Sequence, residues 1–300
     1  TQTVNNPLFD FSDEQQFYDN FLLPANGLLQ FNPASEEVIT HIVNTVAEIA
    51  TDYDVDGIHY DDYFYPSEDF ETYGEDRQYN AYKKSGGKLG LEDWRRDNVN
   101  RMVKRVDEAV DTVNATMGKN VSFGISPSPF WAPSTETCTD GNRGMEGGQN
   151  LPCLVSSCYH DLYADTKKWV EEEWIDYILP QVYMNMTGYY PLLVEWWANV
   201  VSGTNVKLYL GTGICEVVAN KYPQTEIAEQ IKWVRSNPTI KENVDGYVFF
   251  SYQSFTKATK TALMFVYQYF KTDAITPTST LSSNPGTTNG TLGCVELTDK

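Results

Sequence analysis

Basic side chains are scarce in this sequence of 300 residues, where 22 lysines and arginines stand against 41 aspartates and glutamates, a formal charge of −19. Proteins that bind nucleic acid or anionic lipid draw much of their affinity from lysine and arginine. We therefore expect no nucleic-acid partner. The acidity does not identify a substrate, because by itself it mainly confers solubility.

Long apolar runs and a targeting leader are also lacking. No run reaches the roughly 18 apolar residues that a membrane-spanning helix needs, so we expect no membrane insertion. The first ten residues contain no charged and then apolar leader, and we interpret them as mature or internal sequence. What is present, 41% apolar and 14% aromatic residues, is typical of a folded globular chain.

Metal and nucleotide motifs are absent as well. Cys138, Cys153 and Cys158 lie in a segment rich in glycine, serine and threonine, but no CxxC pair occurs and His160 is the only histidine nearby, so the spacing suits no tetrahedral zinc site. No GxGxxG or GxxxxGK[ST] follows an expected strand. We therefore expect neither a metal nor another cofactor.

The cysteines have two readings, a disulfide that pins a long loop or free thiols. The sequence also contains four Asn-X-Ser/Thr sequons, at Asn114, Asn120, Asn185 and Asn289. A disulfide and sequons are both compatible with an extracellular or secreted glycoprotein, which we expect.

Apolar strands alternate with amphipathic helices along most of the chain. We expect strands at 57–60, 121–126, 176–184, 206–212 and 246–251. We expect helices at 35–49, 94–113, 161–174, 192–200, 225–235 and 255–270. Five apolar strands, each followed by a helix, predict an α/β fold with a parallel sheet, either a (β/α) barrel or a doubly wound sheet.

The segment at 54–66, DVDGIHYDDYFYP, carries the clearest chemistry. Strand alternation places His59 and Asp61 on one face, with Asp61 where barrel enzymes hold catalytic groups. A carboxylate beside an imidazole and three aromatic residues suits a glycan site, because the acid acts at an oxocarbenium-like centre while rings stack on sugars. The alternative is that Asp61 or Asp62 caps the next segment and His59 belongs to the core.

This segment resembles the signature of glycosyl-hydrolase-like family ten, the YngK-like bacterial proteins. Further motifs match in the same order: LLQFNP at 28–33, WRRDNVNRMV at 94–103, FGISPSPFW at 123–131, WIDYILPQVYM at 174–184, LVEWWANVVSGTNVKLYLGTGI at 193–214 and GYVFFSY at 246–252. The resemblance implies a (β/α)8 TIM-type barrel and glycoside hydrolysis, with denuded peptidoglycan glycan strands as one known substrate. The pattern DGxxxD is also similar to the α-amylase clan motif, which would make Asp61 the nucleophile.

The resemblance also implies that barrel strands one to three are missing. Residues 1–27 remain unmatched, 28–270 correspond to about five βα units, and 271–300 form a tail rich in Ser, Thr, Pro and Gly. Because an open barrel edge is unfavourable unless it is covered, we expect a missing N-terminal segment or a partner chain to complete the barrel.

The remaining candidate site residues follow from strand parity and from the family pattern. A glycosidase needs two carboxyl groups. Asp62 and Glu216 are the candidates in this chain, although the family suggests that the second lies on an absent strand, and surface solvation is the alternative role of Glu216. The expected sugar-binding residues are His59, Tyr63, Tyr65, Trp131, Gln181, Tyr183 and Asn185. Trp196 and Trp197 are expected to divide between the core and the surface.

Two functions are therefore predicted. The first is a glycoside hydrolase acting on a polysaccharide or peptidoglycan-like glycan, with Asp61 as nucleophile or charge stabiliser. The second is a glycan-binding or structural extracellular glycoprotein without activity on the same scaffold.

Overall fold

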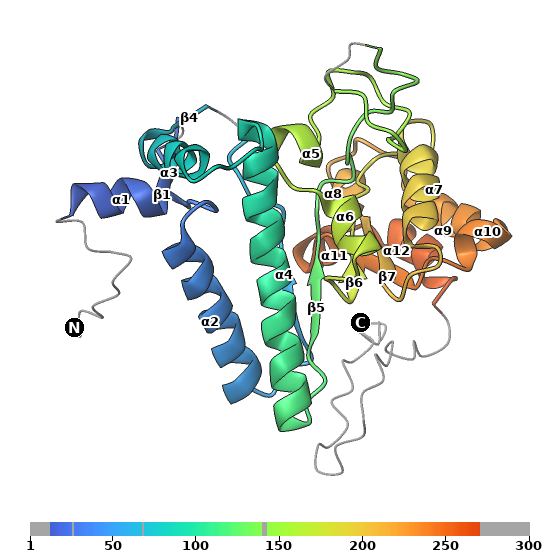
Figure 1. The fold of residues 1–300 in the computed structure, drawn as a ribbon. Coiled ribbons are helices and arrows are strands. Elements are labelled where there is room, and N and C mark those ends of the chain that lie inside the picture. The colour runs from blue at the N-terminus through green and yellow to red at the C-terminus, as the bar shows by residue number, and fades with distance from the viewer. Residues whose placement is uncertain (1–12, 26, 68, 140–142, 271–300) are drawn as a thin grey trace.

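The centre of the protein is a five-stranded parallel sheet (Figure 1). The computed structural model describes residues 13–25, 27–67, 69–139 and 143–270. The strands lie side by side in chain order: β3 (Gly57–Tyr60), β5 (Ser122–Ile125), β6 (Tyr177–Ile178), β7 (Lys207–Thr212) and β8 (Gly246–Phe249). The predicted α/β class and the five parallel strands are confirmed.

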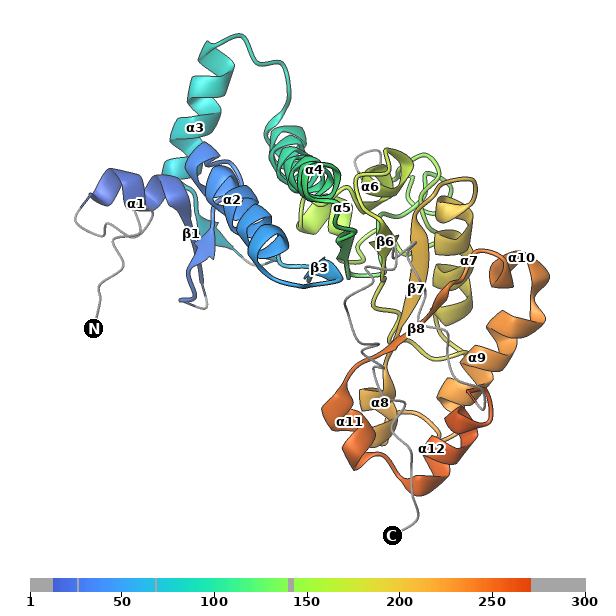
Figure 2. The same cartoon turned by 90° about the horizontal axis from the view of Figure 1, so that it is seen from below.

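Helices cover one face of this sheet (Figure 2). The covering helices are α2 (Glu36–Asp52), α4 (Leu91–Met117), α6 (Thr166–Glu171), α7 (Tyr190–Val201) and α9 (Glu226–Ser236). The other helices are α1 (Glu14–Asn20), α3 (Tyr73–Lys84), α5 (Cys158–Asp161), α8 (Ile214–Val218), α10 (Pro238–Lys241), α11 (Tyr252–Lys257) and α12 (Lys260–Tyr267). In the part of the chain that the structure describes, none is long and apolar enough to cross a bilayer.

The two long helices form where the sequence predicts them, but α2 continues to Asp52, past the expected end at 49, and α4 extends at both ends beyond the expected 94–113. Ser35 caps α2 by accepting a hydrogen bond from the N–H of Val38 at 3.3 Å, an interaction worth about 1 kcal/mol. Gly118 ends α4 with a positive φ of 65°, which glycine adopts without steric cost. The apolar faces of α2 and α4 then pack together and on β3 and β5, which forms one continuous core.

The sheet is open. Within the described residues the strand order runs from β3 to β8 and does not return, so both of these strands are edges and no barrel closes. The uncovered face carries His59 and Asp61 at one edge and the exposed Val248 and Phe250 at the other. The TIM barrel therefore remains a prediction for the whole protein and is not a property of this chain alone.

A second, antiparallel sheet is a feature that periodicity did not predict. It joins β1 (Phe21–Pro24) to β2 (Gln30–Phe31) on one side and to β4 (Phe70–Glu71) on the other. The strands have four, two and two residues, too few for a period-two pattern to show. The helix α3 was also missed, because its face is polar and only Gly74 and Glu75 are buried.

Two predicted helices are divided in the structure. The expected helix 161–174 is interrupted between α5 and α6, where the side chain of Asp165 accepts from the N–H of Lys168 and starts a new helix. The expected helix 255–270 divides between α11 and α12, where Thr259 caps α12 through the N–H of Ala262. In both places a capping side chain competes with continuation of the helix.

The expected strand 176–184 is also shorter than predicted. Only β6 forms a regular ladder, because Pro180 has no N–H to donate. The chain beyond β6 nevertheless stays beside its neighbours, since the N–H of Gln181 donates to the carbonyl of Pro127 at 3.0 Å. The predicted tail at 271–300 lies outside the described residues.

Candidate active site

The site is built at the carboxyl end of β3, where register brings three strands together. His59 pairs with Gly124 on β5, and Gly124 pairs with Tyr177 on β6. Because Gly124 has no Cβ, the Tyr177 ring lies over it; a Cβ there would be 2.3 Å from two ring atoms. The ring of Tyr177 consequently stacks on the His59 imidazole, with centroids 5.8 Å apart and planes at 6°.

Both nitrogens of His59 have partners. Nδ1 lies 3.0 Å from the hydroxyl of Tyr177, and Nε2 lies 2.9 Å from the hydroxyl of Ser126. Since Ser126 donates to the carbonyl of Tyr60 at 3.4 Å, we assign the Nε2–H tautomer, with Tyr177 as the donor to Nδ1. Burial lowers the pKa of His59 and the charge of Asp61 opposes that shift, so the imidazole is held neutral at pH 7.

Asp61 is oriented by two donors. Its Oδ1 accepts from the side-chain amide of Gln181 at 3.0 Å and from the N–H of Asp62 at 3.0 Å. Gln181 is itself fixed by donating to the carbonyl of Ser126 at 2.8 Å. Gln181, predicted to bind a sugar hydroxyl, thus has its amide nitrogen committed to Asp61, and the side chain of Asp61 is exposed.

Asp62 follows Asp61 directly, beyond the last residue of β3, and is half-buried. Burial raises its pKa, and the neighbouring Asp61 raises it further. The thiol of Cys158, at the start of α5, is fully buried, and this burial raises its pKa. The negative charge of Asp62 raises the pKa of the Cys158 thiol further. Asp62 therefore holds a proton to higher pH than an ordinary aspartate, as a general acid requires.

The other predicted polar residues lie toward β7 and β8. Glu216 sits on α8, where Lys221 pairs with its carboxylate at 2.8 Å. Tyr183 is half-buried, and burial raises its pKa together with the charges of Cys215, Asp61 and Asp62. Asn185 accepts a hydrogen bond from the hydroxyl of Thr187 at 3.2 Å. The structure thus brings Tyr183 near the aspartates, whereas the partly buried Glu216 is paired with the exposed Lys221.

The predicted aromatic residues differ in accessibility. Tyr63 is 80% exposed beside Asp61, whereas Tyr65 is only 1% exposed, packed 5.7 Å from the guanidinium of Arg95. Trp131 is likewise buried: it stacks on Trp196, and its ring N–H donates to Asp165 at 3.0 Å. Of the three, only Tyr63 can meet a ligand in this conformation. The expected division of Trp196 and Trp197 is confirmed, since Trp197 is fully buried and Trp196 is not.

A cavity of about 420 Å³ opens along the free edge of β3. His59, Asp61 and Tyr63 line its polar side, and the opposite wall comes mainly from β2, α2 and α4. Gln30 fixes the loop above it by donating to the carbonyls of Tyr63 and Phe64 at 3.2 and 3.1 Å. Asp61 therefore lines an open cavity at the free edge of the sheet.

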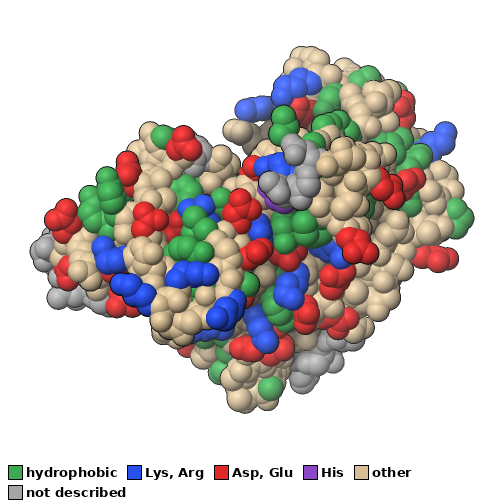
Figure 3. Space-filling model, turned by 45° about the horizontal axis from the view of Figure 1, so that its top comes forward, with side chains coloured by type: hydrophobic (Ala, Val, Ile, Leu, Met, Phe, Trp, Pro, Cys, Tyr) green, Lys and Arg blue, Asp and Glu red, His purple; other side chains and the backbone are tan. Residues whose placement is uncertain are grey.

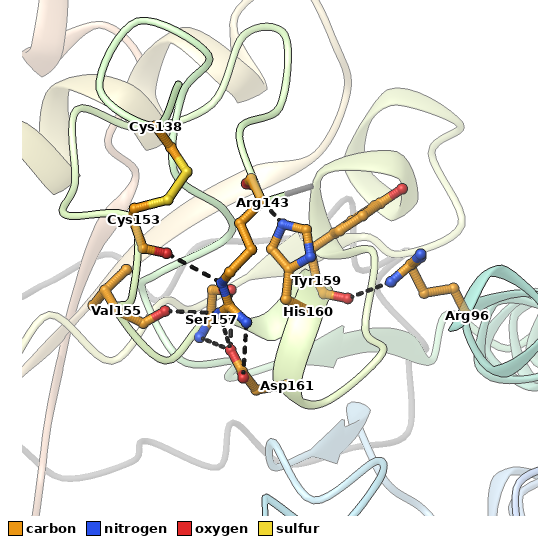
Figure 4. Close-up of polar contacts among 9 residues, drawn as sticks. All are labelled: Arg96, Cys138, Arg143, Cys153, Val155, Ser157, Tyr159, His160 and Asp161. Atoms are coloured by element: carbon orange, nitrogen blue, oxygen red, sulfur yellow. Dashed lines mark hydrogen bonds and ion pairs between the residues drawn. A yellow bond between two sulfur atoms is a disulfide. The ribbon is translucent and has the colours of Figure 1, made fainter. Parts of the chain in front are cut away.

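The long loop after β5 is held by a disulfide and an arginine (Figure 4). Cys138 pairs with Cys153, so the first reading of the cysteines is the one that the structure has. Arg143 donates to the carbonyls of Cys153 and Val155, both at 3.1 Å, and forms an ion pair with Asp161 at 2.7 Å. These contacts fasten α5, and with it Cys158 beside Asp62, to the disulfide-closed loop.

Tyr177 and Ser126 are the functional residues that sequence reasoning missed or undervalued. Neither Ser126 nor Tyr177 was among the predicted site residues. Tyr177 has the same parity as Gln181 and Tyr183, so extending that alternation back through β6 would have found it. The hydrogen bonds of Ser126 to His59 come from tertiary pairing, which alternation does not specify.

The charged side chains on the surface of the described residues are of both signs. Figure 3 shows lysine, arginine, aspartate and glutamate side chains interspersed over one face of the molecule. Several are paired on the helices, such as Arg96 with Asp93 at 2.7 Å and Lys168 with Glu172 at 3.4 Å.

Comparison with known proteins agrees with this architecture. Residues 16–233 match the family described as Glycosyl hydrolase-like 10. Glycosyl hydrolase YngK of Bacillus subtilis is 33% identical over 234 residues, which cover 76% of this chain and 43% of that protein. Glycosyl hydrolase DigH of Escherichia coli K12 is 32% identical over 191 residues, 62% of this chain and 39% of that protein.

The chain thus spans less than half the length of these curated relatives. The family match covers well over half of the chain, including β3, β5, β6 and β7 and the network around His59 and Asp61. The chain therefore belongs to the Glycosyl hydrolase-like 10 family.

Proposed function

We propose that the protein hydrolyses glycosidic bonds in a polysaccharide or peptidoglycan-like glycan, with Asp61 as nucleophile or charge stabiliser. Family membership supports a glycoside-hydrolase type of function. The observation that carries the role of Asp61 is its fixed orientation. Gln181 and the N–H of Asp62 both donate to Oδ1, and Asp61 lines the cavity along β3.

In the proposed reaction a carboxylic acid protonates the glycosidic oxygen as the bond from that oxygen to the anomeric carbon breaks. The Asp61 carboxylate either bonds to the anomeric carbon or stabilises its positive charge. Water then attacks that carbon, which breaks any bond to Asp61 and supplies the hydroxyl of the product, and the remaining proton of the water returns to the acid. Asp62, with its raised pKa, is the acid available in this chain. A carboxyl group from outside the described residues is the other candidate.

The test is release of reducing ends from purified glycan strands by the full-length natural protein. Asp61→Asn should lower kcat by at least about a thousandfold, because the neutral amide cannot stabilise the cationic transition state. Asp56→Asn is the matched control, since Asp56 is exposed before the opposite end of β3. Full activity in Asp61→Asn would overturn the assignment.

A glycan-binding protein without activity is the second candidate. It is favoured by the ion pair that occupies Glu216, which leaves only Asp62 beside Asp61 as a second carboxyl group in the described chain. Glycan binding by the full-length protein, with no release of reducing ends at any pH, would support this function.

We also propose that the open sheet is part of a (β/α)8 barrel in the whole protein. The free edges of β3 and β8 offer unpaired backbone groups to further strands. These strands would come from another part of a longer polypeptide or from a partner chain. Hydrogen exchange that is slow at β8 in the full-length protein, and fast in this chain alone, would support closure; equally fast exchange would contradict it.

Secretion is proposed on the disulfide, because such bonds persist in oxidising compartments. The sequons contribute little. The Asn114 amide already donates to the carbonyl of Val121 at 2.9 Å, and the Asn120 amide nitrogen is buried. Asn185 remains half-exposed, and Asn289 lies outside the described residues. Mass spectrometry of the native protein, alkylated without reduction, should find Cys138 joined to Cys153.

A further inference from the structure

Phe250 holds a large apolar ring at the carboxyl end of β8 with 54% of its surface exposed. Its backbone is fixed on both sides: its N–H donates to the carbonyl of Thr212 at 2.9 Å, and its carbonyl accepts from the N–H of Cys215 at 3.1 Å. The chain then enters α11 at Tyr252. The ring is therefore exposed at a defined position.

Tyr183 packs directly against this ring. The two centroids are 5.6 Å apart and the planes meet at 27°, a stacked arrangement. Gly213, after β7, makes room for Tyr183, because a Cβ there would lie only 3.0 Å from the Tyr183 Cβ. The hydroxyl of Tyr222 donates to the Tyr183 carbonyl at 3.1 Å. Elements from three places in the sequence thus hold one aromatic pair.

The hydroxyl of Tyr183 connects this pair to the acidic site. Burial, the Cys215 thiol and the carboxylates of Asp61 and Asp62 all raise its pKa, so it stays protonated and can donate. Among the described residues it has no hydrogen-bond partner. A donor without a partner, within the field of two carboxylates, is available for a sugar hydroxyl.

We infer that Tyr183 and Phe250 form a carbohydrate subsite, which binds the sugar next to the one at Asp61 and so selects a polymeric glycan. An exposed aromatic face offers apolar contact to the C–H face of a pyranose, and a neighbouring donor fixes its orientation. The subsite lies toward β8, whereas Tyr63 lies at the β3 edge. A glycan chain would therefore run across the carboxyl ends of the strands.

The exposure of the Phe250 ring is explained less well by a further strand that would pair with the free edge of β8 than by a bound sugar. Such a strand would pair with the outward backbone groups of β8, but α11 begins two residues after Phe250. Phe250 then stands at the rim of the sheet, beside Tyr183 and not between strands. Val248 precedes Phe250 on the same face and lies within β8, so it is the residue that an added strand would cover.

The inference rests on the proposed function for the identity of the sugar polymer, and its test separates the two. The full-length protein is assayed on glycan-strand fragments of increasing length, from disaccharide to octasaccharide. Phe250→Ala should raise KM for the octasaccharide about three- to tenfold with little change in kcat, and leave the disaccharide unaffected. Phe250→Tyr should restore the parent KM because it keeps the ring.

Tyr53→Ala is the matched control, since Tyr53 is also an exposed aromatic residue but follows α2 at the far end of the sheet. If the parent protein hydrolyses the fragments and Phe250→Ala has no length-dependent effect, the subsite is overturned and the proposed hydrolase function stands. If the parent turns over no fragment, the proposed function fails and octasaccharide binding is measured by calorimetry. Weaker binding by Phe250→Ala then supports the subsite, and equal binding overturns it.

Discussion

The two edges of the parallel sheet differ in the side chains that they present on the uncovered face. At β3, His59 and Asp61 are held by hydrogen bonds from Tyr177, Ser126 and Gln181. At β8, Val248 and Phe250 are exposed and apolar, and stacking on Tyr183 is the main contact of Phe250. The β3 edge therefore presents polar groups that neighbouring strands hold in place, whereas the β8 edge presents an exposed apolar surface.

The difference shows how polar side chains at the end of a short strand can be held in a fixed orientation. His59 and Asp61 are exposed, yet they are ordered by side chains that reach across from β5 and β6. Hydrogen bonds of this kind orient groups more strongly than they stabilise the fold, because each contributes only about 1 kcal/mol net. Substitutions at the β3 edge should therefore change more than those at the β8 edge.

The largest difference is expected between Gly124→Ala and Val248→Ala. The new methyl group at Gly124 would overlap the Tyr177 ring, and relieving that overlap should cost about 1–3 kcal/mol of unfolding free energy. Val248 is 43% exposed, so its truncation should cost only about 0.5 kcal/mol. Urea denaturation measures both values, and equal losses would show that the two edges do not differ in packing.

A smaller difference is expected between two tyrosines on the same face. Tyr177→Phe removes the donor to His59 and should cost about 1 kcal/mol, with loss of activity. Tyr209→Phe should stay within about 0.5 kcal/mol, since the Tyr209 ring packs beside Gly246 and no hydrogen bond ties its hydroxyl in the described chain. Thermal unfolding of both variants makes the comparison. A larger loss from Tyr209→Phe would contradict the assigned role of Tyr177.

The smallest effect concerns titration. The pKa of His59 lies below its ordinary value of 6.5, so protonation favours the unfolded chain. The contribution of this group to stability is full above pH 6.5 and is lost as pH falls through the folded-state pKa. Asp61→Asn should lower the pKa of His59 further, because it removes a favourable negative charge.

Proton NMR of the His59 ring measures this shift. Phe250→Ala, at the other edge, should leave the titration unchanged. A His59 pKa that rises in Asp61→Asn would mean that the carboxylate does not lie beside the imidazole as the structure has it.

Much of the fold follows from local sequence. The apolar faces of α2 and α4 and the five apolar strands were predicted, because repeated burial leaves a periodic pattern. The divided helices were not predicted, since Asp165 and Thr259 act through single hydrogen bonds at positions where apolar periodicity continues. The antiparallel sheet has strands too short to leave a pattern.

The site was predicted in part for the same reason. Alternation along β3 placed His59 and Asp61 on one face, and parity placed Tyr183 with them. Alternation does not report depth, however. Tyr65 and Trp131 proved to be buried, and Glu216 proved to be paired with Lys221. Phe250 was passed over because its exposure depends on α11 turning away directly after it.

The sequence alone therefore determined the α/β class, the acidic surface, the family and the position of Asp61 at a strand end, because these depend on composition, periodicity and contiguous motifs. Only the tertiary structure decided which groups hold Asp61 and His59, which aromatic rings are accessible, and that the sheet is open. These properties depend on contacts between strands that are 50 to 120 residues apart in the chain, such as that of Gln181 with Asp61 across 120 residues. No local pattern encodes such contacts.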